Sequence, residues 1–180
     1  MKKILAISLM FTLPALAHAG LLDGKTEELK GKLEHQAESK ARAKGNEKLA
    51  AQVNKKLLAE SRKNQCSFKS GSDQLAPGCD AKSKKLANAI ISVKKSLQSQ
   101  GHGGFKFIVT GHTDSSGDPA KNKELSQRRA QVMVNQLVAK GVDKNDIDAL
   151  GMGSERMLVR PDNTPAKKAK NRRYEVEVRF

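Results

Sequence analysis

The feature that most constrains the fold of this 180-residue chain is an alternation of strand-like and helix-like segments after residue 64. Residues 105–110 are rich in aromatic and β-branched side chains, which is typical of a buried strand. Residues 174–180 carry apolar residues at every second position, which is the period of a strand with one buried face. Shorter strands are expected over residues 67–70 and 147–152. Strands that alternate with helices indicate a two-layer α/β domain.

Two helices are expected between these strands. Within residues 81–100, apolar residues recur at the spacing of one helical face: Leu86, Ala89, Ile90, Val93 and Leu97. A second stripe lies in residues 122–140, formed by Ala130, Met133, Val134, Leu137 and Val138. Residues 153–171 are expected to form a long polar loop. We therefore expect an α/β domain (an α+β sandwich) over residues 64–180, of βαβαβ-type topology, with two main helices on a small mixed sheet.

Residues 20–63 differ in composition from the rest of the chain, because Lys, Glu, Ala and Leu dominate there. Apolar residues recur every four positions from Leu29 to Leu57, a stripe that is too narrow for an independent core. Gly45 interrupts this pattern, so we expect a charged helical arm or hairpin with two helices joined at Gly45. Its charged face is expected to be solvated, and the alternative is that it contacts an outer-membrane or other envelope protein.

The first 19 residues have the layout of a secretory signal peptide. Lys2 and Lys3 precede an apolar stretch over residues 4–17, and Ala17-His18-Ala19 presents small residues before a cleavage site. The apolar stretch is shorter than the ~18–20 residues of a transmembrane helix. We expect cleavage after Ala19 and a periplasmic location, with an uncleaved membrane anchor as the alternative.

The two cysteines, Cys66 and Cys79, are separated by only 13 positions. In an oxidising compartment such a pair favours an intramolecular disulfide, and two free thiols are the alternative. Two cysteines cannot complete a four-ligand zinc site without histidine, and the four histidines are scattered. The sequence therefore predicts no metal site and no cofactor.

The chain is strongly basic, with 34 Lys and Arg against 19 Asp and Glu, and it is poor in aromatic residues. Base-stacking sites need several aromatic platforms, so nucleic acid is not expected as the natural partner. No nucleophile–base–orienter set is apparent, and we predict no catalytic residue and no enzymatic activity. The excess positive charge leaves electrostatic binding of a polyanion, such as lipopolysaccharide or nucleic acid, as an alternative function.

Three short motifs follow one another in the second half of the chain. G-H-T-D occupies residues 111–114, at the carboxyl end of the strand expected at 105–110, where α/β domains usually bind ligands. N-x-x-L-S-x-x-R-A covers residues 122–130, and N-R-R covers residues 171–173. In this order and spacing, the motifs resemble the OmpA-like peptidoglycan-binding domain, over roughly residues 66–180.

The resemblance implies a ligand and the residues that hold it. The ligand is the diaminopimelate of the peptidoglycan stem peptide, which keeps an ammonium and a carboxylate on one carbon. Asp114 can hold the ammonium, and Arg129 can clamp the carboxylate through two parallel hydrogen bonds. The other pocket residues that the family implies are Thr113, Asn122, Leu125 and Arg173. The implied function is non-covalent binding that tethers a periplasmic or envelope assembly to the cell wall.

Several residues near these motifs have a structural interpretation instead. His112 is interpreted as a packed residue at the strand end, and Gly111 as a close backbone approach or tight turn. Arg128 and Arg172 are expected to be solvated charges. Residues 167–168 are Lys-Lys where the family usually has Gly-Arg, which leaves the geometry of residues 153–171 open.

Overall fold

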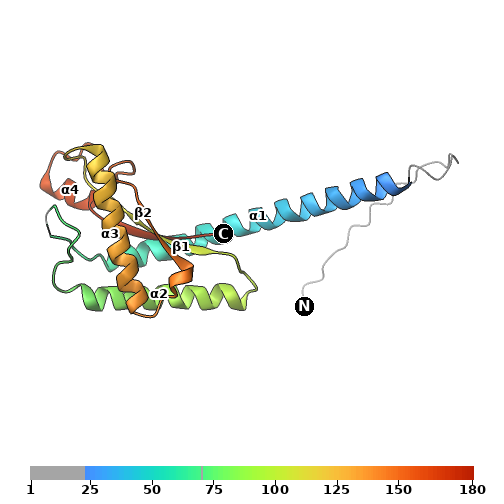
Figure 1. Cartoon of the computed structure of the whole chain (residues 1–180), viewed down its shortest axis with the longest axis horizontal. Helices are drawn as coiled ribbons and strands as arrows, with labels where there is room; N and C mark the ends of the chain where they lie inside the picture. Colours follow the sequence, from blue (N-terminus) through green and yellow to red (C-terminus); the bar gives the residue numbers. More distant parts are fainter. Residues whose placement is uncertain (1–22, 70) are drawn as a thin grey trace. The chain divides into compact units, whose positions relative to one another are not determined.

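We describe residues 23–69 and 71–180 of the chain from a computed structural model (Figure 1). The signal peptide expected over residues 1–19 lies outside the described residues. The elements follow in this order: α1 (Asp23–Lys63), α2 (Cys79–Ser99), β1 (Lys106–Gly111), α3 (Pro119–Ala139), a 3₁₀ turn η1 (Lys144–Asp146), β2 (Ile147–Gly151), α4 (Pro165–Asn171) and β3 (Tyr174–Arg179).

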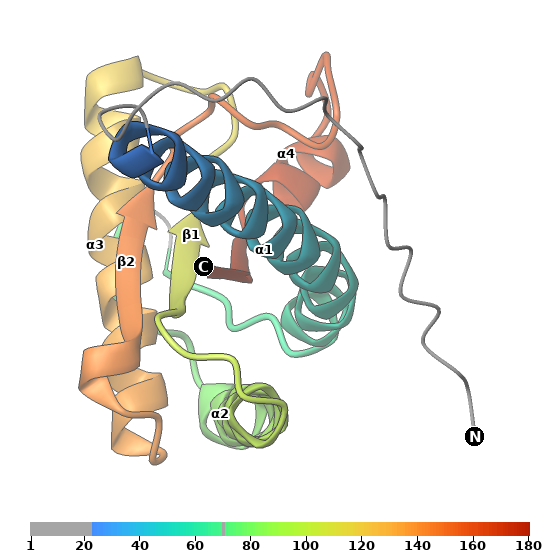
Figure 2. The same cartoon turned by 90° about the vertical axis from the view of Figure 1, so that its right-hand side faces the viewer.

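The three strands form one mixed sheet in the order β2-β1-β3. β1 is parallel to β2, with Phe107 opposite Ile147, and antiparallel to β3, with Phe107 opposite Val178. α3 packs against β1 and β2, and α2 packs against α3 (Figures 1 and 2). The predicted fold class, two main helices on a small mixed sheet, is confirmed.

Two smaller expectations differ from the structure. Residues 67–69, the described part of the strand expected over residues 67–70, make only an isolated bridge between Phe68 and Leu75. The polar loop expected over residues 153–171 contains the short helix α4. Thr164 caps this helix and Pro165 begins it, a combination that favours a helix start even in a polar segment.

α1 is a single helix that continues through Gly45, so the break expected there is wrong. A glycine inside a helix costs only about 1 kcal/mol, which is too little to end a helix without a second signal. The chain divides into two compact units between Arg42 and Ala43, and not after residue 63. The later part of α1 belongs to the second unit, because Leu57 is 1% exposed and lies in its hydrophobic core.

Polar side chains of α1, and of Gln65 just after it, form hydrogen bonds with the backbone along the outer edge of β3. The Asn54 amide accepts the backbone N–H of Val178 at 2.6 Å and donates to its carbonyl at 3.1 Å. Gln65 makes the same pair of contacts with Tyr174, at 3.2 and 2.7 Å. Ser61 accepts the N–H of the residue between them on the same strand edge, at 3.1 Å. An unpaired strand edge invites pairing with another chain, and here a helix closes it.

The predicted disulfide between Cys66 and Cys79 is confirmed, and it joins the segment after α1 to the start of α2. The Tyr174 hydroxyl lies beside it, donating to the carbonyl of Asn64 and accepting the N–H of Cys66 at 3.1 Å. Burial raises the pKa of Tyr174 to about 12. The disulfide and this tyrosine together fix the end of α1 against the sheet.

Candidate ligand-binding site

The close approach of α3 to the end of β1 creates the site. A Cβ atom at Gly111 would lie 2.2 Å from the backbone oxygen of Ser126, so only glycine permits this contact. The interpretation of Gly111 as a close backbone approach agrees with this geometry. The contact brings the middle of α3, which carries Arg129, next to the end of β1, which leads into the loop that carries Asp114.

Asp114 is a nearly buried carboxylate, 8% exposed, at the carboxyl end of β1. Its Oδ1 accepts the backbone N–H of Ser116 at 3.0 Å, and its Oδ2 accepts Nη1 of Arg172 at 2.7 Å. Burial alone raises the pKa of Asp114, but the hydrogen bonds from Arg172 and Ser116 outweigh burial and lower the pKa below its usual value. Asp114 is therefore ionised at neutral pH.

Arg172 and Arg173 make contacts that differ from those expected for them. Arg172 was expected to be a solvated charge, but it pairs with Asp114. Arg173 was expected beside the ligand, and its guanidinium donates instead to Glu175 at 2.9 Å and to the carbonyl of Arg156 at 3.0 Å. Arg172 ends α4 and Arg173 precedes β3, and their guanidinium groups contact two different carboxylates, those of Asp114 and Glu175.

Arg129 is also 8% exposed, and its guanidinium carbon lies 5.0 Å from the centre of the Phe68 ring. Its Nε donates to the carbonyl of Ser72 at 2.8 Å. Burial, together with the positive charge of Arg172, lowers the pKa of Arg129, while Asp114 opposes this effect. Asp114, Arg129 and Arg172 thus form one electrostatic group of a single carboxylate and two guanidinium ions.

The remaining expected pocket residues are Thr113, Asn122 and Leu125. Thr113 is 4% exposed, its N–H donates to the carbonyl of Gly153 at 2.9 Å, and its hydroxyl has no partner among the described residues. Asn122 donates to the carbonyl of Ser116 at 2.8 Å and so holds the loop after Asp114. Leu125 is half-buried on α3.

The role of Asp162 could not be predicted from the sequence. Its carboxylate accepts the N–H of Ser115 at 3.0 Å, the Ser115 hydroxyl, and Nδ2 of Asn171 at 3.0 Å. These hydrogen bonds, led by that of the Ser115 side chain, lower the pKa of Asp162 to about 2. Asn171 is fully buried and also accepts the N–H of Leu158 at 2.9 Å. Asp162 and Asn171 therefore connect the loop before α4 to the loop that carries Asp114.

His112 is 2% exposed, and neither ring nitrogen has a hydrogen-bond partner in the described part of the chain. Its Nε2 lies 3.7 Å from a carboxylate oxygen of Glu175. Burial, followed by the positive charge of Arg173, lowers the pKa of His112 to about 4, and Glu175 opposes this shift. The imidazole is neutral at neutral pH, in agreement with its interpretation as a packed structural residue.

A metal site is not apparent in residues 23–69 and 71–180, where no group of three or more His, Cys, Asp or Glu side chains is placed to bind an ion. The helices in this part of the chain also include none that is both long and apolar enough to cross a bilayer.

The fold and the motif at the end of β1 define an OmpA-like α/β domain. The OmpA family model matches residues 67–172, which is more than half of the chain, so the chain belongs to the OmpA family. The family expectation from the three motifs is therefore confirmed.

Individual relatives match over shorter segments. Outer membrane protein A of Klebsiella pneumoniae is 40% identical over 80 residues, which are 40% of this chain and 23% of that protein. Peptidoglycan-binding protein ArfA of Mycobacterium tuberculosis is 39% identical over 73 residues, which are 41% of this chain and 22% of ArfA. The match thus spans less than a quarter of the length of these two relatives.

Solved structures agree with the fold. The periplasmic domain of Helicobacter pylori MotB superposes with a TM-score of 0.51 at 22% identity, over 64% of this chain and 68% of that one. The peptidoglycan-associated lipoprotein of Burkholderia pseudomallei gives a TM-score of 0.51 at 23% identity, over 64% of this chain and 89% of that one. At such identities the similarity establishes the fold.

Proposed function

We propose that this chain binds peptidoglycan non-covalently through the diaminopimelate of the stem peptide. The observation that carries the proposal is the nearly buried carboxylate of Asp114, which is paired with the partly exposed Arg172 and interacts electrostatically with the nearly buried Arg129. A ligand carbon that bears both an ammonium and a carboxylate matches such a group. Membership of the OmpA family, and a relative that is named as a peptidoglycan-binding protein, support the same ligand.

Each ligand group has a partner in this arrangement. Asp114 is ionised at neutral pH and accepts the ligand ammonium. Its two oxygens offer about four acceptor positions in total, and Ser116 and Arg172 use one each in the free protein. Arg129 donates to the ligand carboxylate, and its contact with Phe68 orients the guanidinium. Binding by these contacts requires no bond to be made or broken.

The location and the tethering role belong to the same proposal. Export through a signal peptide cleaved after Ala19 places the domain in the periplasm, where the cell wall lies. The segment of α1 before Ala43 belongs to a separate unit, and in this proposal it contacts an outer-membrane or other envelope protein. Such a contact tethers an envelope assembly to the wall.

Sedimentation with purified sacculi tests the proposal. Asp114→Ala should weaken binding at least about tenfold, because a charge-assisted hydrogen bond contributes roughly 1.5–3 kcal/mol. Asp148→Ala is the matched control, since Asp148 is an exposed carboxylate on β2 whose side chain is 60% exposed. Sacculi with lysine in place of diaminopimelate should bind weakly, because lysine lacks the second carboxylate.

Electrostatic binding of a polyanion, the alternative function, predicts a different effect of Asp114→Ala on binding. Removing a negative charge would then leave binding unchanged or strengthen it, and binding would fall steeply with salt. If Asp114→Ala sediments with sacculi as well as the unaltered chain does, the proposed site is wrong.

A further inference from the structure

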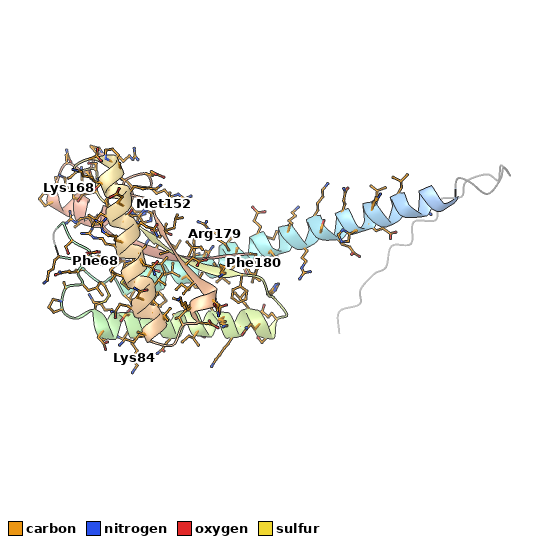
Figure 3. The ribbon with its side chains drawn as sticks, in the orientation of Figure 1. Phe68, Lys84, Met152, Lys168, Arg179 and Phe180 are labelled. Carbon is orange, nitrogen blue, oxygen red and sulfur yellow. A yellow bond between two sulfur atoms is a disulfide. The ribbon has the colours of Figure 1, made fainter. Side chains whose placement is uncertain are left out.

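A second surface feature adjoins the site. A shallow depression of about 520 Å³ is lined by residues of the loops before α3 and α4 and by α4 itself, among them Ser115, Arg160, Asp162 and Lys168. Ser115 is the chain neighbour of Asp114, so the depression begins where the proposed diaminopimelate site ends. Figures 1 and 2 both place α4 at the end of the domain where α3 begins, and Figure 3 labels Lys168 there.

The lining of the depression carries a net positive charge, because Arg160 and Lys168 outnumber its one carboxylate, Asp162. Within the described residues, neither Arg160 nor Lys168 forms an ion pair with a carboxylate. Arg160 donates to the carbonyls of Ser154 and Glu155, at 3.4 and 3.3 Å, and Lys168 donates to the hydroxyl of Ser116 at 2.7 Å. Both cations therefore keep donors for a ligand anion.

Asp162, the carboxylate that also lines the depression, already accepts hydrogen bonds at both of its oxygens. Ser115 donates to both of its oxygens, and Asn171 donates to Oδ2 at 3.0 Å. The carboxylate faces these donors and so supports the wall of the depression. It leaves Arg160 and Lys168 as the groups that select the charge of a ligand.

Lys168 is connected to Asp114 through one residue. Lys168 donates to the Ser116 hydroxyl, and the Ser116 N–H donates to Oδ1 of Asp114 at 3.0 Å. Two hydrogen bonds that share Ser116 thus link Lys168 to Asp114, so a ligand ammonium that contacts Asp114 lies near the Lys168 ammonium. A second anion on the same ligand, a short distance along its chain, fits this placement.

We propose that the depression binds the terminal carboxylate of the D-alanine that follows diaminopimelate in a stem tetrapeptide, with Lys168 and Arg160 as its donors. This inference rests on the proposed function. One end of diaminopimelate keeps the zwitterion for Asp114 and Arg129, and its other carboxyl group continues into D-alanine. The free carboxylate of D-alanine is the next anion along that chain, and it is absent from a stem peptide that ends in an amide.

Titration calorimetry with two synthetic tetrapeptides, one ending in a D-alanine carboxylate and one in the corresponding amide, tests the inference. The unaltered chain should bind the acid up to about fivefold more tightly, since a partly exposed ion pair contributes up to about 1 kcal/mol. Lys168→Gln should remove most of this preference, and Lys168→Arg should keep it. Lys170→Gln is the matched control, because Lys170 lies on the same helix but does not line the depression.

The two proposals fail in different ways. Equal binding of acid and amide by the unaltered chain, or an intact preference in Lys168→Gln, would overturn the inference about the depression alone. A third peptide, with lysine in place of diaminopimelate, reports on the proposed function. If it binds as tightly as the acid tetrapeptide, the diaminopimelate site itself is wrong.

Discussion

Nη1 of Arg172 donates to Oδ2 of Asp114 at 2.7 Å, across 58 positions of the sequence. The contact joins the loop after β1 to the segment between α4 and β3. The carboxylate is nearly buried, whereas the Arg172 side chain is 44% exposed. The main anion of the proposed site is therefore held in its charged form by a residue at the solvent boundary.

Replacing Arg172 with glutamine should raise the pKa of Asp114. The hydrogen bond and the charge of Arg172 both lower this pKa, and burial alone raises it. Carbon-13 NMR titration of the Asp114 carboxyl group should show the change, with Arg128→Gln as a control on an exposed arginine. An unchanged pKa in Arg172→Gln would mean that the ion pair is not formed in solution.

Arg129→Lys should weaken binding of a diaminopimelate stem peptide about tenfold or more. An ammonium ion cannot donate two parallel hydrogen bonds to one carboxylate, and each charge-assisted bond contributes roughly 1.5–3 kcal/mol. Calorimetry with the peptide measures the loss. Arg128→Lys, a change in the neighbouring exposed side chain, should bind like the unaltered chain. Equal losses in both variants would show that Arg129 has no special role.

A chain that begins at Ala43 should fold cooperatively, whereas one that begins at residue 64 should not. The longer chain keeps Leu57 in the core and keeps the contacts of Asn54 and Ser61 with the edge of β3, and the shorter chain lacks all three residues. Thermal unfolding followed by circular dichroism distinguishes the two. A sharp transition in the shorter chain would show that α1 is dispensable.

Within the full chain, Leu57→Ala should lower the free energy of unfolding by about 2–5 kcal/mol, because it leaves a cavity in the core. Leu33→Ala should change it by no more than about 0.5 kcal/mol, because Leu33 is 65% exposed. Urea unfolding measures both values. Similar effects at the two positions would contradict the division of α1 between the two units.

The stability of the domain should fall as the pH decreases from about 6.5 towards 4. The pKa of His112 is about 4 in the folded chain and ordinarily 6.5, so the unfolded chain binds a proton in this range before the folded chain does. The loss attributable to His112 is at most about 3 kcal/mol. His112→Asn should remove this part of the pH dependence in urea unfolding, and His35→Asn, a change on the exposed face of α1, should not.

Gly111→Ala should destabilise the domain by about 1–3 kcal/mol or more, because the added methyl group meets the backbone of α3, which cannot move aside. Gly31→Ala is the control, since nothing lies within 4 Å of the added atom and alanine favours a helix. Melting temperatures should move in opposite directions. A neutral Gly111→Ala variant would mean that α3 does not approach β1 so closely.

The sequence by itself determined the elements and the chemistry of the motifs. Apolar periodicity located α2, α3 and β3 to within a few residues, because burial of one face imposes a period of 3.6 or 2 on the chain. Aromatic and β-branched content located β1. Cysteine spacing and the expected export indicated the disulfide that the structure contains. The three motifs indicated the OmpA family, to which the chain belongs.

Only the tertiary structure decided which residues meet. The sequence places Arg172 and Arg173 side by side, and the direction of the chain as it enters β3 turns one towards Asp114 and the other towards Glu175. The stripe of α1 looked too narrow for a core, yet Leu57 is buried because the sheet supplies the rest of the contact surface. Asp162 contacts Ser115 across 47 positions of the sequence. No local sequence pattern predicts such a contact, because it forms only when the folded chain brings the two residues together.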